Sequence, residues 1–434
     1  MSRPIRPKID NQQIDPENAS LNLLGKHVAV IGGGVAGLTA ADELALWGAR
    51  VSVIEKSPFL GGVAIQLTCK ATDACVKCGA CIAEEKLQRA GRQPQVAFYT
   101  GTTITGVLAG SGFSLDYHTH SPLINAETCN GCGLCLRKCP VNGALLQGYT
   151  PRLGPYVAIR SELCRFFDHA ACTLCRDICP QGAITLSDQR QQGHLQVDAV
   201  LLATGFAPYN PSTKPFGYNR FCDVITNLDA ERMLREHTVL KRASDDQPAR
   251  RIAFIQCVGS RDATLSHSWC SKFCCGAALR MARLVQTRQP DAQVTFFYID
   301  VQTFGKDFPA FYAQCRDAIE FVRAIPGDIF QTDDGRLQVV YFDPKSGKSV
   351  EAIFDMVILS AGMTPPPGNA DLARMFNWRL DPNGFLQARE RAADLPTGVF
   401  VAGAAQGPMT IAESVSSAGY AVSQMVDYLR TGHK

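Results

Sequence analysis

The first strongly patterned segment of the chain runs from Lys26 to Lys56 and reads KHVAVIGGGVAGLTAADELALWGARVSVIEK. Apolar runs at Val28–Ile31 and Val51–Ile54 are typical of buried strands, and the alanine- and leucine-rich stretch between them is long enough for a helix. Glycines separate the first strand from that helix. The pattern predicts a strand, a turn, a helix and a second strand, which is the βαβ unit of an α/β fold.

Apolar segments farther along the chain predict more of the same architecture. Residues 197–205 (VDAVLLATG) form a buried strand, and residues 399–425 form a strand followed by glycine and a helix. Residues 251–255 begin a second unit like the first, and residues 307–325 are expected to be helical. We expect five residues of that helix to face the core: Phe308, Phe311, Tyr312, Ile319 and Phe321.

Composition and charge agree with a folded protein of two or three domains. The chain has 434 residues, of which 46% are apolar and 19% charged, and the net charge is only +3. Charge therefore favours neither nucleic acid nor an anionic membrane surface as a partner. The first 20 residues lack the apolar stretch of a signal peptide, and no apolar run reaches about 18 residues, the length of a membrane span. We expect a flexible leader, no membrane span and a cytoplasmic location.

The glycines of the first unit have the spacing of a dinucleotide site. Gly32, Gly34 and Gly37 fit G-x-G-x-x-G, and Glu55 ends the second strand. Gly32 allows the tight turn, Gly34 lets a pyrophosphate approach the backbone, and Gly37 lets helix and sheet pack closely. Glu55 is placed to accept hydrogen bonds from a ribose. The alternative is a glycine turn with a purely structural role, but this does not explain why Glu55 stands at the end of the second strand.

The segments at residues 197–205 and 399–425 resemble the flavin-contacting elements of two-dinucleotide-domain flavoproteins of the thioredoxin reductase type. The resemblance implies FAD, with the N-terminus of the last helix directed at the flavin. One departure is Ala404, because such proteins usually have an aspartate there, so the ribityl contact is expected from the backbone near Gln406 and Gly407. The expected cofactor-binding residues are Gly32, Gly34, Ala36, Gly37, Glu55, Lys56, Gly62, Thr204, Gly205, Gly403, Gln406 and Gly407.

Between these halves lies an internal repeat rich in cysteine. Residues 124–147 and 159–186 both begin Ile-x-x-Glu-x-Cys and close with Cys-Pro, a pattern that resembles a two-cluster bacterial ferredoxin. The resemblance implies that the fourth cysteine of each run serves the other cluster. One [4Fe–4S] cluster would then be held by Cys129, Cys132, Cys135 and Cys179, and the other by Cys139, Cys164, Cys172 and Cys175. Zinc is the structural alternative, although zinc sites do not require the closing Cys-Pro or the crossed repeat.

The second βα unit lacks the glycines that a pyrophosphate needs, with only Gly259 at its turn. Cysteines stand there instead, in the spacing C-x12-C-x3-CC with Val-Gly-Ser-Arg-Asp after the first. This motif, together with the preceding VIT before Asn227 and AQGPMTIAESV near the C-terminus, resembles the A subunit of heterodisulfide reductase over residues 26–428. The resemblance implies FAD, the thioredoxin reductase fold and an unusual [4Fe–4S] cluster close to the flavin, held by Cys257, Cys270, Cys274 and Cys275.

Two features of this region follow from the resemblance. Cys274 and Cys275 are adjacent, so joint ligation of one cluster is expected to force an irregular helix start. The family usually has a lysine five residues beyond the paired cysteines, near the flavin; Arg280 stands there as a possible flavin-tuning cation. The chain is also shorter than its methanogen counterpart, with no C-terminal ferredoxin extension expected.

A fourth group, Cys69, Cys75, Cys78 and Cys81, follows Gly61-Gly62. A further cluster is expected there, with a redox disulfide or unliganded thiols as alternatives. Cys222 and Cys315 are each alone, and the default for such cysteines is a small buried hydrophobe. His267 lies between cluster cysteines and is expected to be a loop residue rather than a substitute ligand.

These elements predict two Rossmann-like domains with an inserted α+β ferredoxin domain. The expected boundaries are a leader at 1–24, an FAD domain at 25–122, 191–248 and 366–434, a ferredoxin insertion at 123–190, and a former NAD(P)H-type domain carrying an iron–sulfur site at 249–365.

The resemblance implies that the chain is an oxidoreductase, an electron-transfer flavoprotein that works with the other subunits of a heterodisulfide reductase-like complex and with a ferredoxin-type carrier. A homo-oligomer is also expected. The alternatives are an NAD(P)H-linked reductase like the small subunit of glutamate synthase, and a binding or assembly protein with structural clusters. The missing second glycine fingerprint opposes the first alternative, and the intact FAD motif opposes the second.

Overall fold

The computed structural model describes residues 22–120, 122–141, 143–149, 155–169, 172–187, 190–302, 305, 307–388 and 396–431. The expected flexible leader lies outside the described residues up to position 21. Its expected end at residue 24 is wrong, because Leu23 is only 1% exposed and belongs to the hydrophobic core. The backbone N–H of Leu23 donates to the carbonyl of Trp47, which fixes this entry segment beside the first helix.

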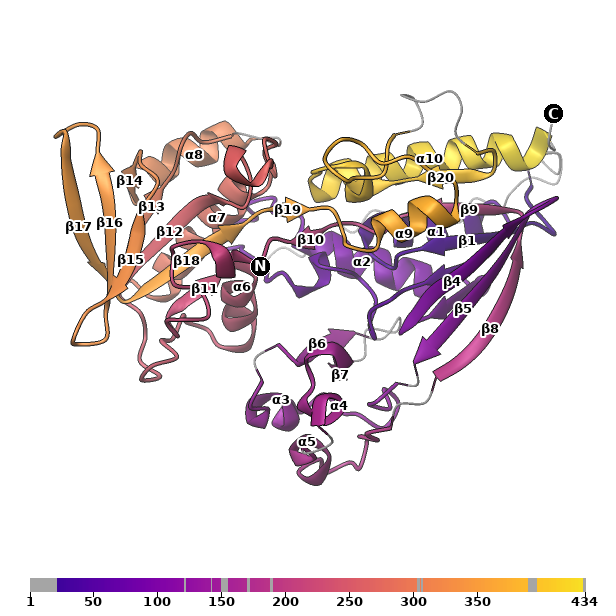
Figure 1. Cartoon of the computed structure of the whole chain (residues 1–434), viewed down its shortest axis with the longest axis horizontal. Coiled ribbons are helices and arrows are strands. Elements are labelled where there is room, and N and C mark those ends of the chain that lie inside the picture. Colours follow the sequence, from indigo (N-terminus) through magenta and orange to yellow (C-terminus); the bar gives the residue numbers. More distant parts are fainter. Residues whose placement is uncertain are drawn as a thin grey trace, which may run out of the picture.

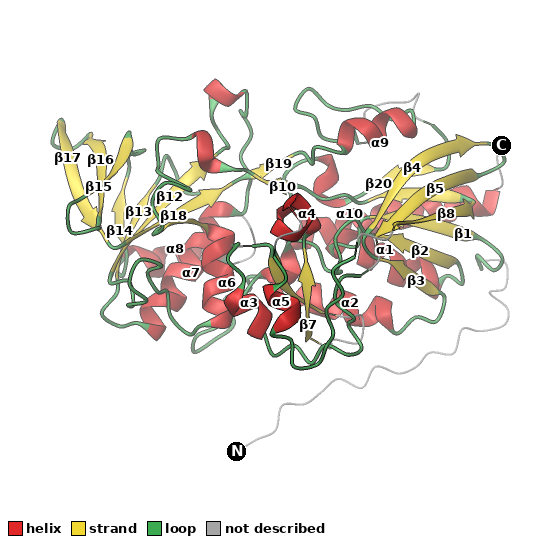
Figure 2. Ribbon diagram, turned by 60° about the horizontal axis from the view of Figure 1, so that its bottom comes forward, coloured by secondary structure: helices red, strands yellow, loops and turns green. Residues whose placement is uncertain are grey.

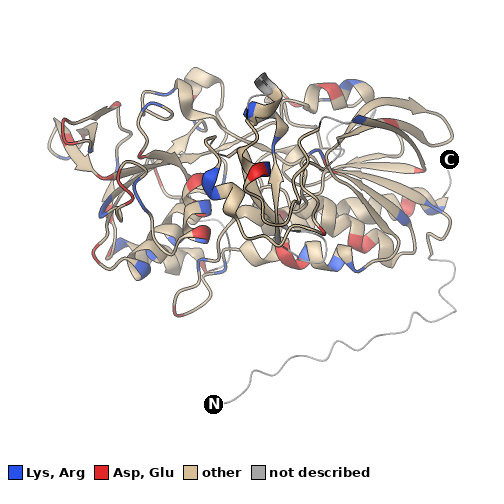
Figure 3. Cartoon of the chain, turned by 90° about the horizontal axis from the view of Figure 1, so that it is seen from below, with Lys and Arg blue, Asp and Glu red and all other residues tan. Residues whose placement is uncertain are grey.

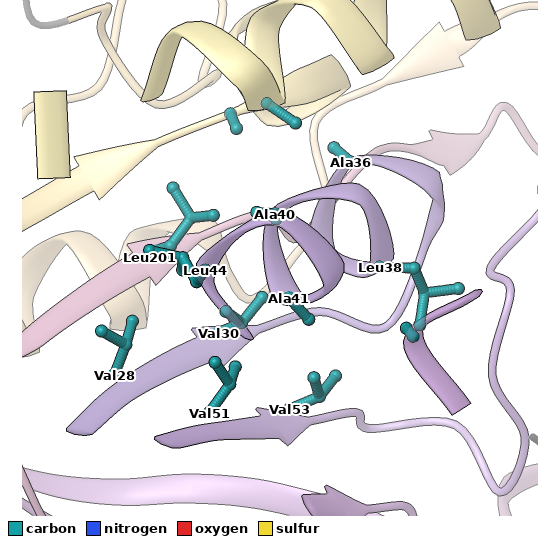
Figure 4. Packing of buried hydrophobic residues seen from close by; sticks show 14 of the residues in the cluster. Val28, Val30, Ala36, Leu38, Ala40, Ala41, Leu44, Val51, Val53 and Leu201 are labelled. Carbon is teal, nitrogen blue, oxygen red and sulfur yellow. The ribbon is translucent and has the colours of Figure 1, made fainter. Parts of the chain in front are cut away.

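The first unit is built on a five-stranded parallel sheet in the order β20-β9-β1-β2-β3 (Figure 1). Its central strand contributes Val28 and Val30 to one face and Ala29 and Ile31 to the other, because side chains alternate along a strand. Figure 4 shows α1 packed over the first of these faces. The elements are β1 (His27–Ile31), α1 (Val35–Leu46), β2 (Arg50–Ile54), α2 (Ala80–Gly91), β3 (Val96–Tyr99), β9 (Ala199–Leu202), β20 (Val399–Val401) and α10 (Ile411–Thr431).

The opposite face of this sheet is covered by an antiparallel sheet in the order β4-β5-β8 (Figure 2). Phe113 and Leu115 of its middle strand pack with Ile31 of the parallel sheet, and Trp378 closes the same core. Both faces of the parallel strands are therefore buried, as their continuous apolar sequences predict. The covering elements are β4 (Thr102–Ala109), β5 (Phe113–His120), β8 (Arg190–Val197) and α9 (Asn369–Met375).

The second unit repeats this plan with a parallel sheet in the order β11-β18-β12-β13-β14. Helices cover one face around Phe254, Leu279 and Phe296, and an antiparallel sheet covers the other around Phe297 and Val339. The elements are β11 (Val224–Thr226), α6 (Asn227–Glu236), β12 (Arg251–Val258), α7 (Cys274–Arg288), β13 (Gln293–Phe297), α8 (Phe308–Arg316), β14 (Glu320–Val322), β15 (Asp328–Gln331), β16 (Leu337–Asp343), β17 (Lys348–Phe354) and β18 (Met356–Ala361).

The two units are joined by a pair of antiparallel crossing segments, β10 (Ala207–Pro208) and β19 (Met363–Thr364). The expected boundary at residue 248 is wrong, because β11 pairs in parallel with β18 of the second sheet and α6 follows it there. The helix begins at a capping box in which the Thr226 hydroxyl accepts from the backbone of Asp229, and the Asp229 carboxylate accepts from the backbone of Thr226. The chain therefore leaves the first unit near residue 208.

The helix expected at residues 307–325 is shorter than predicted. It ends at Arg316, and residues 320–322 instead form β14, which pairs with β13. The apolar residues that suggested one helix belong to two elements that face the same core. Their predicted burial is confirmed, since Phe308 and Ile319 are buried and Phe311, Tyr312 and Phe321 pack against them.

The cysteine-rich repeat forms a small separate body below the first unit in Figure 1. Its core contains Ile124 and Ile184, joined by an antiparallel bridge, together with Val157 and Ile159. The elements are α3 (Leu134–Lys138), β6 (Leu145–Tyr149), β7 (Pro155–Ile159), α4 (Arg165–His169) and α5 (Leu174–Asp177). The described residues also form the short 3-10 turns η2 (Ala64–Gln66), η3 (Ser161–Leu163), η4 (Pro211–Thr213), η5 (Ala263–Leu265) and η7 (Gly403–Gln406).

Acidic and basic residues are interspersed along the chain in the view of Figure 3, in agreement with the small net charge. None of the helices in the described ranges has the length and apolar character needed to cross a bilayer.

Candidate functional site: a glycine cradle and four cysteine groups

The glycine turn after β1 brings helix and sheet into direct backbone contact. Gly32 has φ +113°, and a Cβ there would lie 2.3 Å from the carbonyl oxygen of Ala203. A Cβ on Gly37 would lie 1.9 Å from the carbonyl oxygen of Gly32. These are closer than any real carbon–oxygen contact, so both positions require glycine for the fold itself.

Gly34 differs from the other two glycines because its missing side chain leaves space. The nearest atom to a Cβ at this position would be the Cα of Gly62, 4.0 Å away. Gly62 has φ +60° and faces Gly34 from the turn after β2. Two glycines thus border an open space at the N-terminus of α1, where backbone N–H groups favour an anionic phosphate. This cradle has the shape that a pyrophosphate needs.

Glu55 stands at the edge of the cradle with its carboxylate fixed from two sides. Its Oε2 accepts from the backbone N–H of Gly33 at 2.6 Å, and its Oε1 accepts from that of Ser57 at 2.7 Å. The side chain is buried at the end of β2. A carboxylate has about four acceptor positions, so capacity remains for ribose hydroxyls. Lys56, the next residue, points to solvent.

The C-terminal part of the first unit closes the site from the other side. Gly403 has φ +70°, and a Cβ there would lie 2.6 Å from that of Ala36 on α1. Thr204 donates from its hydroxyl to the side-chain oxygen of Asn369 at 3.2 Å, a partner that no sequence motif indicates. The Gln406 amide is turned inward to the carbonyl of Val401. Gly205 and Gly407 both have positive φ values and open surroundings.

The ferredoxin-like insertion gathers its cysteines around two recesses. Each recess has an empty volume of about 320 Å³, its open mouth included. Three cysteines come from one repeat and the fourth from the other, in the crossed arrangement implied by the resemblance. The first recess is bordered by Cys129, Cys132, Cys135 and Cys179, and the second by Cys139, Cys164, Cys172 and Cys175.

The sulfurs in these recesses lie in mostly apolar surroundings. Burial raises the pKa of both Cys135 and Cys175 to about 11, and neighbouring thiols add to the effect. A thiolate is the form that binds iron, so metal binding must displace protons from these groups.

The second unit gathers Cys257, Cys270, Cys274 and Cys275 between the end of β12 and the start of α7. Burial and the nearby thiols of Cys275 and Cys270 raise the pKa of Cys257 to about 12. Burial raises the pKa of Cys274 as well, and the thiols of the three other cysteines add to this shift. The Cys270 sulfur also accepts from the backbone N–H of Lys272 at 3.3 Å. All four cysteines therefore lie close together.

The irregular helix start expected at this group is wrong. Cys274 and Cys275 are the first two residues of a 15-residue helix, and both are buried. The backbone is unusual elsewhere, since Cys257, Arg261 and Lys272 have φ values of +60°, +55° and +62°. Left-handed conformations of residues other than glycine are costly and tend to occur at functional sites. The loop bends to bring its cysteines to the helix, which stays regular.

The group at residues 69–81 lies in the segment that connects the glycine turn to α2. Burial raises the pKa of Cys81, and the thiols of Cys78, Cys75 and Cys69 add to this shift. The four cysteines therefore lie near one another. Three of them are exposed, and Cys78 is half-buried. Lys70, within this segment, is only 2% exposed and forms an ion pair with Glu231 of α6. The segment is thus tied to the second unit.

The structure also shows the positions of four other residues that the sequence motifs single out: His267, Cys315, Cys222 and Arg280. His267 lies in a loop, with its Nδ1 2.9 Å from the Gly259 carbonyl. Cys315 is fully buried, as expected, but Cys222 is exposed, so its predicted burial is wrong. Arg280 donates from Nε to the carbonyl of Val76 at 2.8 Å, which places it against the 69–81 segment.

Contacts connect the cysteine groups to the first unit. Cys129 packs against the core of that unit, and the Tyr156 hydroxyl donates to the Pro58 carbonyl. A Cβ on Gly79 would meet Ile411, the first residue of α10, at 3.6 Å. The first ferredoxin recess and the 69–81 segment therefore both adjoin the unit that carries the cradle.

Two family models match parts of the chain. One is described as an NAD(P)-binding Rossmann-like domain and matches residues 30–83. The other is described as a 4Fe-4S binding domain and matches residues 122–143. They cover the glycine cradle and the first cysteine run.

Curated relatives match almost the whole chain. The A subunit of the H(2):CoB-CoM heterodisulfide,ferredoxin reductase of Methanothermobacter marburgensis is 32% identical over 95% of this chain and 65% of its own length. The iron-sulfur A subunit of the CoB–CoM heterodisulfide reductase of Methanocaldococcus jannaschii is 32% identical over 92% of this chain and 63% of its own. The chain thus spans a little under two thirds of these relatives, and its resemblance to this heterodisulfide reductase family is confirmed.

Solved structures show the same fold at low identity. Thioredoxin reductase of T. acidophilum superposes with a TM-score of 0.53 at 14% identity, covering 93% of this chain and 97% of its own. Thioredoxin reductase of Lactococcus lactis gives a TM-score of 0.52 at 15% identity, covering 93% and 99%. The predicted thioredoxin reductase-like α/β fold is confirmed.

Proposed function

We propose that this chain, a homologue of the heterodisulfide reductase A subunit over 95% of its length, is an FAD- and iron–sulfur-containing electron-transfer protein of such a complex. The observation that carries the proposal is that cysteines gather in four groups of four in a chain that also has the glycine cradle. When bound, a flavin exchanges electrons in pairs or singly, which suits it to work with clusters that carry one electron each.

The cradle supports FAD as its dinucleotide. Gly34 and Gly62 leave room for a pyrophosphate, and Glu55 retains acceptor capacity for a ribose. The turn at Gly403 and the start of α10 lie against α1 at the same site. The N-terminal end of a 21-residue helix favours negative charge, such as that of a reduced flavin. The flavin ring is therefore expected near Gly403, Gln406 and Gly407.

The cysteine groups support [4Fe–4S] clusters at three sites and a fourth at residues 69–81. The crossed pairing of the two ferredoxin recesses is the arrangement of a two-cluster ferredoxin. The recess holding Cys129 adjoins the first unit, so it would be the inner of the two clusters, and the one holding Cys164 the outer. The exposed cysteines at 69–81 offer a second end of the route at the surface.

The partners that fit this arrangement are proteins that give or take single electrons. We infer other subunits of a heterodisulfide reductase-like complex and a ferredoxin-type carrier, acting in the cytoplasm. The chain itself is inferred to be a homo-oligomer.

An NAD(P)H-linked reductase is the second candidate, and the turn after β12 opposes it. A Cβ on Gly259 would lie 2.0 Å from the ring of Tyr209, so this ring covers the place where a pyrophosphate would meet the backbone. The residue directly after β13, at the position that Glu55 occupies after β2, is Tyr298, which is not an acid. The turn glycine is covered by a side chain of the chain itself, and the acid is replaced.

The proposal is tested by the cofactor content of protein purified without oxygen. We expect one FAD per chain and roughly sixteen irons with equal sulfide if all four groups hold four-iron clusters, or roughly twelve if the 69–81 group does not. Cys132→Ser and Cys164→Ser should each alter one ferredoxin-type EPR signal and leave FAD bound. Zinc in place of iron, or four irons or fewer after full reconstitution, would refute the proposal.

A further inference from the structure

We propose that Arg280 is a fixed cation of the 69–81 cysteine group and raises the reduction potential of the cluster held there. The inference rests on the proposed function, because it assumes iron–sulfur clusters at these cysteines. It assigns the guanidinium to the 69–81 cluster, where the resemblance to the family would assign it to the flavin.

The first observation is a direct contact between helix α7 and the cysteine segment. The Nε of Arg280 donates to the carbonyl of Val76 at 2.8 Å. Val76 lies between Cys75 and Cys78 in the sequence, and both thiols are close enough to the guanidinium to affect its pKa. The arginine is therefore bound to the backbone of the segment that carries these sulfurs.

The second observation is that the surroundings hold the guanidinium in place. Its central carbon lies 5.1 Å from the ring centre of Phe308 and 5.3 Å from that of Phe311, over the faces that attract a cation. The helix α8 that supplies these rings is itself tied to the cysteine segment, because Lys77 forms an ion pair with Asp307 at its start. Few rotamers remain open to a side chain held in this way.

The third observation is that α7 leaves room for the guanidinium beside its own first turn. Arg280 follows Gly276 by four residues on α7, and a Cβ on Gly276 would lie 2.8 Å from NH1 of Arg280. Side chains on a helix point back toward its N-terminus, so the guanidinium lies over the first turn. Because Gly276 has no side chain, it leaves space for the guanidinium of Arg280.

A fixed cation at this place has a definite electrostatic effect. One-electron reduction of a cluster held by four thiolates adds one negative charge, which a nearby guanidinium stabilises. Arg280 is partly removed from solvent, so screening by water is weaker than at the surface. The residue should raise the reduction potential of the 69–81 cluster.

The experiment is a redox titration of the purified holoprotein, with clusters followed by EPR and the flavin by absorbance. The 69–81 signal is identified as the one altered in Cys78→Ser. In Arg280→Gln we expect its reduction equilibrium to shift at least tenfold toward the oxidised form, which is about 59 mV for one electron. Arg280→Lys keeps the positive charge but loses the planar set of N–H donors of the guanidinium, so we expect a smaller shift of the potential. Arg283→Gln, on the same helix, serves as the matched control.

The outcomes separate this inference from the proposed function. A shift of the flavin potential with unchanged cluster potentials in Arg280→Gln would show that the residue acts on the flavin, and would overturn the inference. Equal shifts in Arg280→Gln and Arg283→Gln would also overturn it, because the effect would then be one of general charge. If the parent protein contains no iron at residues 69–81, as shown by unchanged iron content in Cys78→Ser, the fourth-cluster part of the proposed function fails and the inference fails with it.

Discussion

Lys70 and Glu231 form an ion pair that is closed off from solvent, with 2.6 Å between Nζ and Oε1 and 2% exposure of each side chain. The second carboxylate oxygen of Glu231 accepts from the backbone N–H of Thr68 at 2.9 Å, and the Lys70 ammonium donates to the Thr68 carbonyl. The pair joins the 69–81 cysteine segment to α6 of the second unit. Two charges placed this deeply are costly unless each has its partner.

Glu231→Gln should therefore destabilise the protein strongly, because it leaves the Lys70 ammonium buried without a counter-charge. We expect a loss of about 3–5 kcal/mol in the free energy of unfolding. The thiols at residues 69–81 should also react faster with a maleimide in the apoprotein. Thermal and urea denaturation, together with labelling rates, measure the two effects.

Glu84→Gln is the matched control, since Glu84 pairs with Arg235 between the neighbouring helices α2 and α6 but is half exposed. Such surface pairs contribute about 0–1 kcal/mol. The double change Lys70→Met with Glu231→Leu should recover much of the lost stability, because no buried charge remains. Equal effects of Glu231→Gln and Glu84→Gln would contradict this account.

Gly34→Ala and Gly37→Ala should separate binding from folding. An added Cβ at Gly34 has no atom nearer than 4.0 Å, so the alanine should fold, but it would intrude where a pyrophosphate lies. At Gly37 the same atom would lie 1.9 Å from a carbonyl oxygen, so the helix would have to leave the sheet. We expect Gly34→Ala to lose FAD at an unchanged apoprotein melting temperature, and Gly37→Ala to lower that temperature. Normal flavin content in Gly34→Ala would mean that the cofactor binds elsewhere.

The cysteine motifs and the glycine turn can be predicted from the sequence because each is a local requirement. The spacing of the ferredoxin repeat, read through its resemblance, implies the sets that border the two recesses, and the turn from β1 to α1 needs glycine whatever surrounds it. The partners of Glu231 and Arg280 cannot be predicted in this way. Both contacts join segments far apart in the chain, and nothing in the local sequence of either residue shows which segment it meets.

Two of the incorrect predictions concern which elements pack together. The segment Val224–Glu236 precedes the strand at residue 251, which predicts a place in the first unit, but its strand pairs with β18, more than a hundred residues later. Residues 307–325 suggest one helix because their apolar residues face one core. A helix and a strand packed against the same core produce the same composition.

His27 should make the stability of the first unit depend on pH. Its Nδ1 lies 2.8 Å from Arg50 NH2, which can only donate, so Nε2 carries the proton and faces the Ser52 hydroxyl at 2.9 Å. Burial, followed by the charge of Arg50, lowers the pKa of His27 below its ordinary 6.5. The unfolded chain therefore takes up a proton first as the pH falls through 6.5, and stability declines until the lowered pKa is passed.

The test compares urea midpoints between pH 7.5 and 5.5. We expect the midpoint to fall with pH in the parent and to fall less in His27→Gln. A parent-like slope in His27→Gln would assign the pH dependence to other groups.

NADH and NADPH alone should reduce the flavin of this protein slowly. The Tyr209 ring covers Gly259, so a dinucleotide at the second unit would have to displace an aromatic ring. Anaerobic stopped-flow mixing should show little bleaching of oxidised flavin over seconds at micromolar NAD(P)H, while dithionite bleaches the same sample fully. Rapid bleaching by either nucleotide, without a partner protein, would make the chain a self-contained reductase and would require a nucleotide site other than the turn after β12.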